Sequence, residues 1–356
     1  MFKKIALLLL CVCLVGTVGC KKKSELEVEK QPESSEVIVS ETAPEPEVQL
    51  NVNPLTGLSD VSDEAINNKP VAITINNIKI AQPVQTGLNK ADVIYETEVE
   101  GGITRLLAVF QDPSKAEKIG TVRSARYVFI DLAMGHNAVY IHHGMDYFHA
   151  LQHLDDVPRM ELQTSNGGVR IKNGLASEHT LYAYGNKILS GISKKGINMK
   201  NDSVKSWQKF APETESISLS QTANAVTVPF NSNVKSTFTY DTETGRYTRS
   251  FNGTIRKDYS TNENVTVKNV FVLMTSIANY DCKNVPGDIY QHRQVSLNSG
   301  EGYYFVNGTY TPIKWSKGGA SDSLKLMNSD GTELTVNAGN SWICFADSNK
   351  SKPVIQ

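Results

Sequence analysis

The sequence predicts an α+β protein, with an N-terminal α/β domain built on a mixed sheet and a C-terminal domain that is mostly β. Up to residue 212, strand-like and helix-like segments alternate along the chain. From Ile217 onward, short β-rich runs are separated by turn residues at intervals of about ten. Residues 53–356 also exceed the usual size of one hydrophobic core, so we expect two domains, 53–212 and 213–350.

The first 20 residues predict a secretion signal. A basic start, MFKK, precedes the apolar run IALLLLCVCLV and the small-residue ending GTVGC. Cys20 follows Thr17-Val18-Gly19, which resembles the bacterial lipobox, where cleavage leaves a diacylated cysteine. We therefore expect membrane lipid as a partner through Cys20, on the extracytoplasmic face of the cell membrane. An ordinary signal peptide with a chance cysteine, or an uncleaved anchor, would be the alternatives.

Residues 21–52 predict a disordered acidic tether. They contain eight Glu, four Lys and three Pro but no aromatic residue. Such a composition cannot bury enough apolar surface to offset the entropy of ordering. The remaining body is close to neutral, which argues against a nucleic-acid partner.

In the first domain, alternating β-branched residues predict strands, and apolar residues at helical spacing predict helices. Gly101-Gly102 predicts a tight reversal between two strands, and Gly135 a helix cap. The predicted strands are Pro70–Asn76, Asp92–Val99, Ile103–Phe110 and Ala138–His143, and the predicted helices are Arg123–Met134, Met145–Leu154 and Thr180–Ile192.

In the second domain, three Xaa-Gly pairs mark hairpin turns, namely Asn252-Gly253, Asn307-Gly308 and Asp330-Gly331. Their spacing is typical of an all-β sheet or sandwich. The predicted strands are Ala225–Phe230, Val234–Tyr240, Gly245–Phe251, Val265–Thr275, Gly302–Phe305, Lys325–Met327, Glu333–Val336 and Ser341–Phe345.

The stretch from Glu96 to Asp131 predicts a charged cleft. If its helix begins at Arg123, then Arg123, Arg126 and Tyr127 share one face, and two guanidiniums at a helix N-terminus favour an anion. Arg105 on the neighbouring strand could join them.

Three glutamates, Glu96, Glu98 and Glu100, alternate along the preceding strand and are expected on one face. They could pair with the arginines in an internal ion-pair network that leaves nothing for a ligand. If a ligand binds instead, the expected binding residues are Arg105, Arg123, Arg126, Glu96, Glu100, Asp131, His143, His179 and Tyr182.

Histidines gather between residues 136 and 153. His149 and His153 are four apart, as in joint metal ligation, but HALQH lacks the glutamate of a zinc protease. We expect no metal, no cofactor and no catalytic residue, since nucleophile-elbow and phosphate-loop motifs are also missing from the sequence. Cys282 and Cys344 could form a disulfide or remain free thiols.

Five segments of the first domain carry a family resemblance, namely NPLTGL (53–58), KPVAITINN (69–77), QTGLNKADVIYETEVE (85–100), GGITRLLAVFQ (101–111) and IGTVRSARYVFIDL (119–132). Through them the chain resembles the YerB-like lipoproteins, a two-part family of unknown biochemical function in Gram-positive bacteria. The second part is similar through Val267–Val272, Trp315-Ser316-Lys317 and Asn328–Trp342. Where the family commonly has Pro-His-Asn-Leu-Tyr, this chain has Glu178-His179-Thr180-Leu181-Tyr182, so only His179, Leu181 and Tyr182 carry over.

The resemblance implies location and fold but no reaction. We therefore expect a lipid-anchored binding module for a cell-wall fragment or an envelope protein, acting through the charged cleft. A cell-wall hydrolase using Glu96 or Glu100 is one alternative, and a structural scaffold without a ligand is the other.

Overall fold

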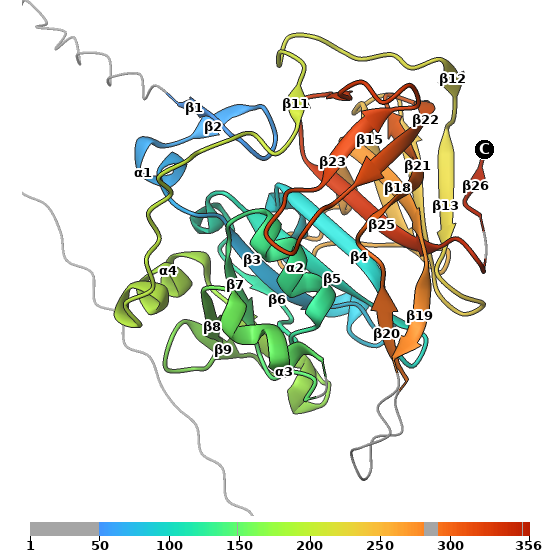
Figure 1. Cartoon of the computed structure of the whole chain (residues 1–356). Helices are drawn as coiled ribbons and strands as arrows, with labels where there is room; N and C mark the ends of the chain where they lie inside the picture. Colours follow the sequence, from blue (N-terminus) through green and yellow to red (C-terminus); the bar gives the residue numbers. More distant parts are fainter. Residues whose placement is uncertain (1–49, 148, 281–290, 351) are drawn as a thin grey trace, which may run out of the picture. The chain divides into compact units, whose positions relative to one another are not determined.

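The computed structural model describes residues 50–147, 149–280, 291–350 and 352–356 (Figure 1). Cys20, the signal segment, the acidic tether and Cys282 lie outside these residues. Within the described part, no helix is both long enough and apolar enough to span a bilayer. Cys344 is a free, fully buried cysteine.

One mixed sheet organises the fold. Its parallel pairs include β18 with β25, β25 with β4, and β3 with β7, whereas β4 with β5 is antiparallel. The strand order is β12 (Gln221–Thr222), β22 (Thr309–Ser316), β21 (Ser299–Val306), β18 (Asn269–Thr275), β25 (Ser341–Asp347), β4 (Val93–Glu100), β5 (Ile103–Phe110), β3 (Val71–Asn76), β7 (Val139–His142) and β8 (Arg159–Glu161), with β19 (Ile277–Tyr280), β20 (His292–Val295) and β23 (Lys325–Asn328) attached beside this path.

This sheet joins early and late parts of the chain. β25 pairs in parallel with β4, with Ser341 opposite Val93 and Cys344 opposite Glu96. The side chains of β4 and β5 alternate between two hydrophobic cores, and Leu106 and Leu107 lie on opposite faces. Strands buried on both faces read as nearly continuous apolar runs, which explains why Ile103–Phe110 was recognisable from sequence.

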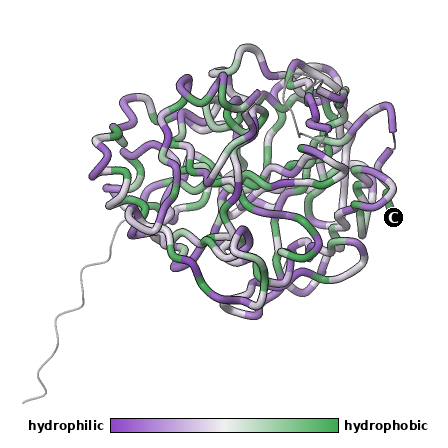
Figure 2. Tube along the Cα trace, turned by 90° about the horizontal axis from the view of Figure 1, so that it is seen from below, coloured by the Kyte–Doolittle hydropathy of each residue, from purple (hydrophilic) through white to green (hydrophobic). Residues whose placement is uncertain are grey.

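A second sheet covers one of these faces. It contains β16 (Thr254–Ile255), β15 (Arg246–Phe251), β14 (Lys235–Asp241), β13 (Ala225–Pro229) and β26 (Val354–Ile355), with β17 (Thr266–Val267) paired to β15. Hydrophobic and hydrophilic residues alternate along much of the trace in Figure 2. In β15 the alternation is regular, with Tyr247, Arg249 and Phe251 buried. Asn252 and Gly253 both have positive φ, which confirms the predicted hairpin turn.

Within the described ranges helices are few and short. They are α1 (Asp63–Ile66), α2 (Tyr127–Gly135), α3 (Ala150–His153) and α4 (Gly185–Lys194), with 3-10 turns η1 (Gln82–Val84), η2 (Leu88–Lys90), η3 (Pro113–Lys115), η4 (Leu154–Asp156) and η5 (Ser177–His179). The small sheets are β1 (Asn51–Val52) with β2 (Ser59–Val61), β6 (Ile119–Gly120) with β10 (Leu181–Ala183) and β9 (Gly168–Arg170), and β11 (Lys209–Phe210) with β24 (Thr335–Val336). α2 packs its apolar side on the other face of the main sheet, through Phe129 and Leu132.

The predicted α+β class with a mixed sheet is confirmed, but the predicted helices were too long. The segment expected as a helix over Thr180–Ile192 begins as strand β10, which pairs with β9 and β6, and becomes helix only at Gly185. The segment expected as a helix over Met145–Leu154 contains only the four helical residues of α3, followed by η4. Backbone pairing with distant segments overrides local helix preference in the first case.

Candidate functional site

The strand that carries the three glutamates contains an irregularity that separates them. In β4, Glu98 lies opposite Thr104, but Glu100 lies opposite Ile103, so the register shifts between Glu98 and Glu100. An inserted residue of this kind reverses which face the following side chain occupies. The prediction that Glu96, Glu98 and Glu100 share one face was therefore wrong.

Glu100 forms a buried ion-pair cluster with two of the predicted arginines. Its carboxylate oxygens lie 2.7 Å from Nη2 of Arg105, and 2.5 and 2.6 Å from Nε and Nη2 of Arg126. Burial alone would raise the pKa of Glu100, but the two guanidiniums outweigh it and lower this pKa to about 2. The remaining donors of Arg105 and Arg126 include contacts to the carbonyl oxygens of Ser124 and Ala125.

The third arginine is placed differently because the helix starts later than expected. Arg126 is the N-cap of α2, and Arg123 precedes it in an extended segment where its N–H donates to Thr74 O. Val122 bridges Ile75 in the same segment, so strand-like pairing takes the backbone that a longer helix would need. Arg123 and Arg126 therefore do not share a helix face, which corrects the sequence-based geometry.

Arg123 is held at the turn η5. Its Nη1 donates to Glu178 O at 3.2 Å, and its Nη2 lies 3.7 Å from the Glu178 carboxylate. That carboxylate also lies 3.1 Å from Nε2 of His179, whose Nδ1 is 2.8 Å from Asn76 Nδ2. Arg170 also binds this turn, since its Nη1 donates a hydrogen bond to Ser177 O at 2.6 Å.

Two further predicted residues lie next to this turn. His143 Nε2 is 3.0 Å from Nη2 of Arg170, and its Nδ1 is 2.8 Å from Leu162 O. Tyr182 is fully buried, and its hydroxyl donates to Val84 O.

The structure gathers most of the predicted charged residues at one end of β3, β5 and β7, namely Arg105, Arg123, Arg126, Glu100, His143 and His179. Glu96 and Asp131 lie elsewhere.

Glu96 belongs to the opposite core. Its side chain is fully buried and accepts hydrogen bonds from Asn77, Ser236 and Trp342, beside the fully buried Arg249. Arg249 was not among the predicted site residues, because an arginine in a regularly alternating strand is usually assigned to the solvent face. Its position on the inward face of β15, between Tyr247 and Phe251, was the available signal.

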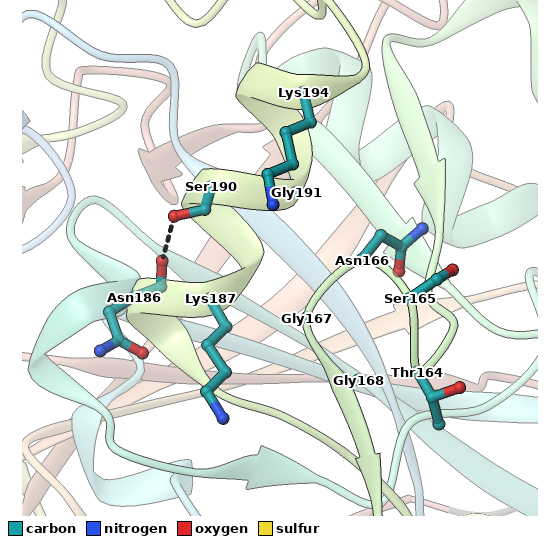
Figure 3. A pocket seen from close by; sticks show the side chains of 10 residues that line it. All are labelled: Thr164, Ser165, Asn166, Gly167, Gly168, Asn186, Lys187, Ser190, Gly191 and Lys194. Carbon is teal, nitrogen blue, oxygen red and sulfur yellow. Dashed lines mark hydrogen bonds between the residues drawn. The ribbon is translucent and has the colours of Figure 1, made fainter.

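A polar groove lies between α4 and the loop that joins β8 to β9 (Figure 3). Its volume is about 440 Å³. The lining residues are Thr164, Ser165, Asn166, Gly167, Gly168, Asn186, Lys187, Ser190, Gly191 and Lys194. Lys187 and Lys194 project from the helix across from the loop, and none of these lining residues is acidic.

The loop wall of this groove is fixed in place. Asn166 donates from Nδ2 to Glu161 O and accepts from the Gln163 N–H. A Cβ atom on Gly191 would overlap Asn166 O, and one on Gly167, which has a φ of +111°, would come within 2.8 Å of the Lys187 backbone. The close approach of loop and helix requires both glycines.

A second cavity, of about 450 Å³, contains Asp131 and is called the Asp131 cavity below. It is lined by residues from both parts of the chain, namely Tyr127, Asp131, His149, His153, Ser276, Ala278, Gln294, Val295, Ser296, Leu297, Asn298, Lys317, Gly318 and Ala320. Burial raises the pKa of Asp131 and lowers the pKa of Lys317 and of His149. Perturbed groups that converge on a cavity are typical of binding sites.

His149 and His153 pack against aromatic rings and against each other. His149 stacks on Tyr127, with ring centres 3.8 Å apart, and meets His153 edge-on at 5.5 Å. Among the described residues, no group of three or more His, Cys, Asp or Glu has a geometry that could hold a metal ion.

The chain matches two family models, described as the N-terminal and C-terminal domains of a protein of unknown function (DUF3048), over residues 55–198 and 226–343. It is 29% identical over 313 residues to the Putative lipoprotein YerB of Bacillus subtilis (strain 168), covering 82% of this chain and 84% of that protein. It is also similar to the crystal structure of the YerB protein from Bacillus subtilis, with a TM-score of 0.72 and 27% identity. That match covers 85% of this chain and 99% of the solved one.

Proposed function

The chain belongs to the DUF3048 family, and we propose that it is a lipid-anchored extracytoplasmic protein that binds an anionic component of the cell envelope. The binding surface is a basic edge, defined here as Arg123, Arg170, Lys187 and Lys194. The groove in Figure 3 carries this proposal, because two lysines and several hydroxyl and amide side chains line it without a carboxylate.

The anchor is supported by the start of the chain. Cys20 follows a basic, apolar and small-residue sequence typical of lipoprotein signals, and the Bacillus subtilis relative is named a lipoprotein. Two acyl chains on one cysteine satisfy the requirement for stable membrane attachment. The acidic tether would then keep the folded part near the membrane, with a reach on the order of 30 Å.

The basic edge has a local excess of positive charge in a chain that is nearly neutral. Residues 161–200 contain six Lys and Arg but only two Glu. β9 links the two ends of the edge, since Gly168 lines the groove and Arg170 lies beside η5. Lysines and arginines arranged along one surface attract polyanions electrostatically.

Arg123 is more exposed than Arg105 and Arg126, which both pair with the buried Glu100. Its side chain is 22% exposed, and its only ion pair among the described residues is the 3.7 Å contact to Glu178, a carboxylate that is 57% exposed. The Nε of Arg123 is buried without a partner within the described structure. A phosphate or carboxylate that approaches this turn would therefore meet an underused guanidinium.

The hydrolase alternative receives no support from its two carboxylates. Glu96 is fully buried between the two sheets, so a polymeric substrate would not reach it. Glu100 is held ionised by Arg105 and Arg126, so it could not donate a proton near neutral pH.

Cosedimentation of residues 21–356 with isolated cell walls, and fluorescence binding to inorganic polyphosphate, test the ligand. We expect binding that weakens as salt rises, because exposed charges are screened. Lys187→Ala with Lys194→Ala should weaken binding by about tenfold, which corresponds to about 1.4 kcal/mol. The matched control, Lys235→Ala with Lys257→Ala, removes two exposed lysines, one in β14 and one just after β16, and should bind like the wild type.

Equal loss in both double variants would show that net charge alone drives binding, and no binding to either material would refute the proposed function. The anchor has a separate test in the native host. Cys20→Ser should prevent acyl labelling and release the protein from the membrane fraction, whereas retention in that fraction would contradict the anchor.

A further inference from the structure

The Asp131 cavity is a second place where the chain offers unmatched charge, on different elements from the basic edge. Its walls come from α2, from the segment around α3, from the β19–β20 hairpin and from the loop after β22. A cavity of about 450 Å³ falls within the usual size range of small-molecule sites.

Asp131 supplies the negative charge in this cavity. Its carboxylate makes no hydrogen bond and no ion pair within the described residues, although the residue is only partly exposed. The surrounding protein therefore disfavours the ionised form without offering a donor, and burial is the main reason that the pKa of Asp131 is raised. A cationic group in the cavity would relieve this cost.

Lys317 supplies the positive charge. The residue is 3% exposed, and its ammonium group donates to Gly319 O at 2.9 Å and to Ala320 O at 2.6 Å. An ammonium has three protons, so these two carbonyl contacts leave one donor to spare. Lys317 and Asp131 both line the cavity and influence each other electrostatically, but no ion pair joins them within the described residues.

We propose that the Asp131 cavity binds a zwitterion, a free α-amino acid, whose ammonium pairs with Asp131 and whose carboxylate takes the open donor of Lys317. Two opposite charges that line one cavity without closing into a pair match a ligand that carries both signs. The hydroxyl and amide groups of Ser276, Ser296 and Asn298 line the same cavity and can satisfy the remaining polar atoms of such a ligand.

Ligands of a single charge fit this arrangement less well. An anion would satisfy Lys317 but be repelled by Asp131, and a simple amine would meet the converse problem. A neutral ligand would leave both charges more deeply desolvated than before. The apolar wall formed by Val295, Leu297 and the Tyr127 ring is available to the amino acid's side chain.

The test is a thermal-shift screen of residues 21–356 against free amino acids, followed by calorimetry on the strongest binder. A ligand that binds only the folded state raises the melting temperature in proportion to its affinity. The decisive comparison is between that amino acid, its α-amide and its N-acetyl derivative. We expect each derivative to bind at least about tenfold more weakly, since each one lacks one of the two charges.

Variants identify the site. Asp131→Asn should abolish amino-acid binding while leaving the fold intact, because Asp131 has no partner in the described structure to lose. Asp155→Asn is the matched control, since its side chain is 93% exposed and should not affect binding. Lys317→Met tests the carboxylate partner, but it also removes two contacts to loop carbonyls and so needs a melting curve beside it.

The proposal is overturned if no amino acid in the screen binds, if either derivative binds as tightly as the parent, or if Asp131→Asn binds like the wild type. It stands apart from polyanion binding at the basic edge. Lys187→Ala with Lys194→Ala should leave amino-acid affinity unchanged, and Asp131→Asn should leave polyphosphate affinity unchanged.

Discussion

Arg249 of β15 lies with its Nη2 3.2 Å from a carboxylate oxygen of Glu96 in β4, and both side chains are fully buried. The guanidinium also lies 4.5 Å from the centre of the Trp342 ring, whose Nε1 donates to the same carboxylate. The pair therefore connects the two sheets through a hydrogen-bonded network in the middle of a hydrophobic core.

Arg249→Met is expected to lower the free energy of unfolding by about 3–5 kcal/mol, because it leaves the Glu96 carboxylate buried without its counter-charge. Urea unfolding followed by tryptophan fluorescence measures the change. The double variant Arg249→Met with Glu96→Gln should be more stable than Arg249→Met alone. Lys235→Met, an exposed change on neighbouring β14, is the control, and strictly additive losses would contradict the coupling.

The low pKa of Glu100 predicts that the protein loses stability in acid. Its pKa is lowered to about 2 in the folded protein, so the ionised form is stabilised by folding. This contribution, about 3 kcal/mol, is fully present above the ordinary pKa of a glutamate and is lost as pH falls from about 4.5 to 2. Melting temperatures of the wild type and Glu100→Gln should therefore converge over this range. A constant difference between them would show that Glu100 does not titrate as described.

The raised pKa of Asp92 predicts the opposite dependence of stability on pH. Burial, reinforced by the nearby Asp60, raises the pKa of Asp92 to about 7, although the Gln111 N–H and Asn53 Nδ2 donate to its carboxylate. The folded state then binds a proton more tightly than the unfolded chain, so stability falls as pH rises from about 4 to 7. Asp92→Asn should remove this decline. Melting temperatures measured between about pH 4 and 7 test this expectation. If the melting temperature of the wild type and of Asp92→Asn changed equally with pH, the role of Asp92 would be refuted.

Gly191→Ala should destabilise the protein by about 1–3 kcal/mol, because the new methyl group would overlap the Asn166 carbonyl on the facing loop. The same change should weaken polyphosphate binding if the groove wall must stay in place. Gly319→Ala is a suitable control, since its nearest contact would be 3.7 Å. Chemical unfolding of both variants gives the comparison, and equal stability would show that the loop yields easily.

Glu178→Ala should strengthen anion binding by about threefold to tenfold, or about 0.7–1.4 kcal/mol. The Glu178 carboxylate lies beside Arg123 and His179 and competes with any anion at this turn. Its exposure means that little stability should be lost. Fluorescence titration with polyphosphate measures the effect, and Glu301→Gln controls for the removal of one negative charge elsewhere.

Local pattern predicted much of the secondary structure. The apolar run Ile103–Phe110 and the Asn252-Gly253 turn carry their conformations in a few adjacent residues. The start of α2 could not be read this way. The sequence of residues 122–125 is compatible with a helix, but the backbone of Val122 and Arg123 pairs with β3 instead.

The structure brings only some of the predicted binding residues together. Arg105, Arg126 and Glu100 do meet, yet the ion-pair alternative describes them better than an open cleft does. The irregularity in β4 decides this, because one extra residue turns Glu100 away from the face of Glu96. Nothing in the spacing of the three glutamates reveals it.

The sequence by itself determined the family, the α+β class, the mixed sheet and most strand positions, because these depend on hydrophobic periodicity and turn residues close together in the chain. Only the tertiary structure decided which charged side chains form ion pairs within the protein and which remain able to bind a ligand. Glu96 finds Arg249 across 153 positions, and Asp131 shares a cavity with Lys317 without pairing. Such partnerships depend on which strands lie side by side, and β25 beside β4 is a contact that no local pattern specifies.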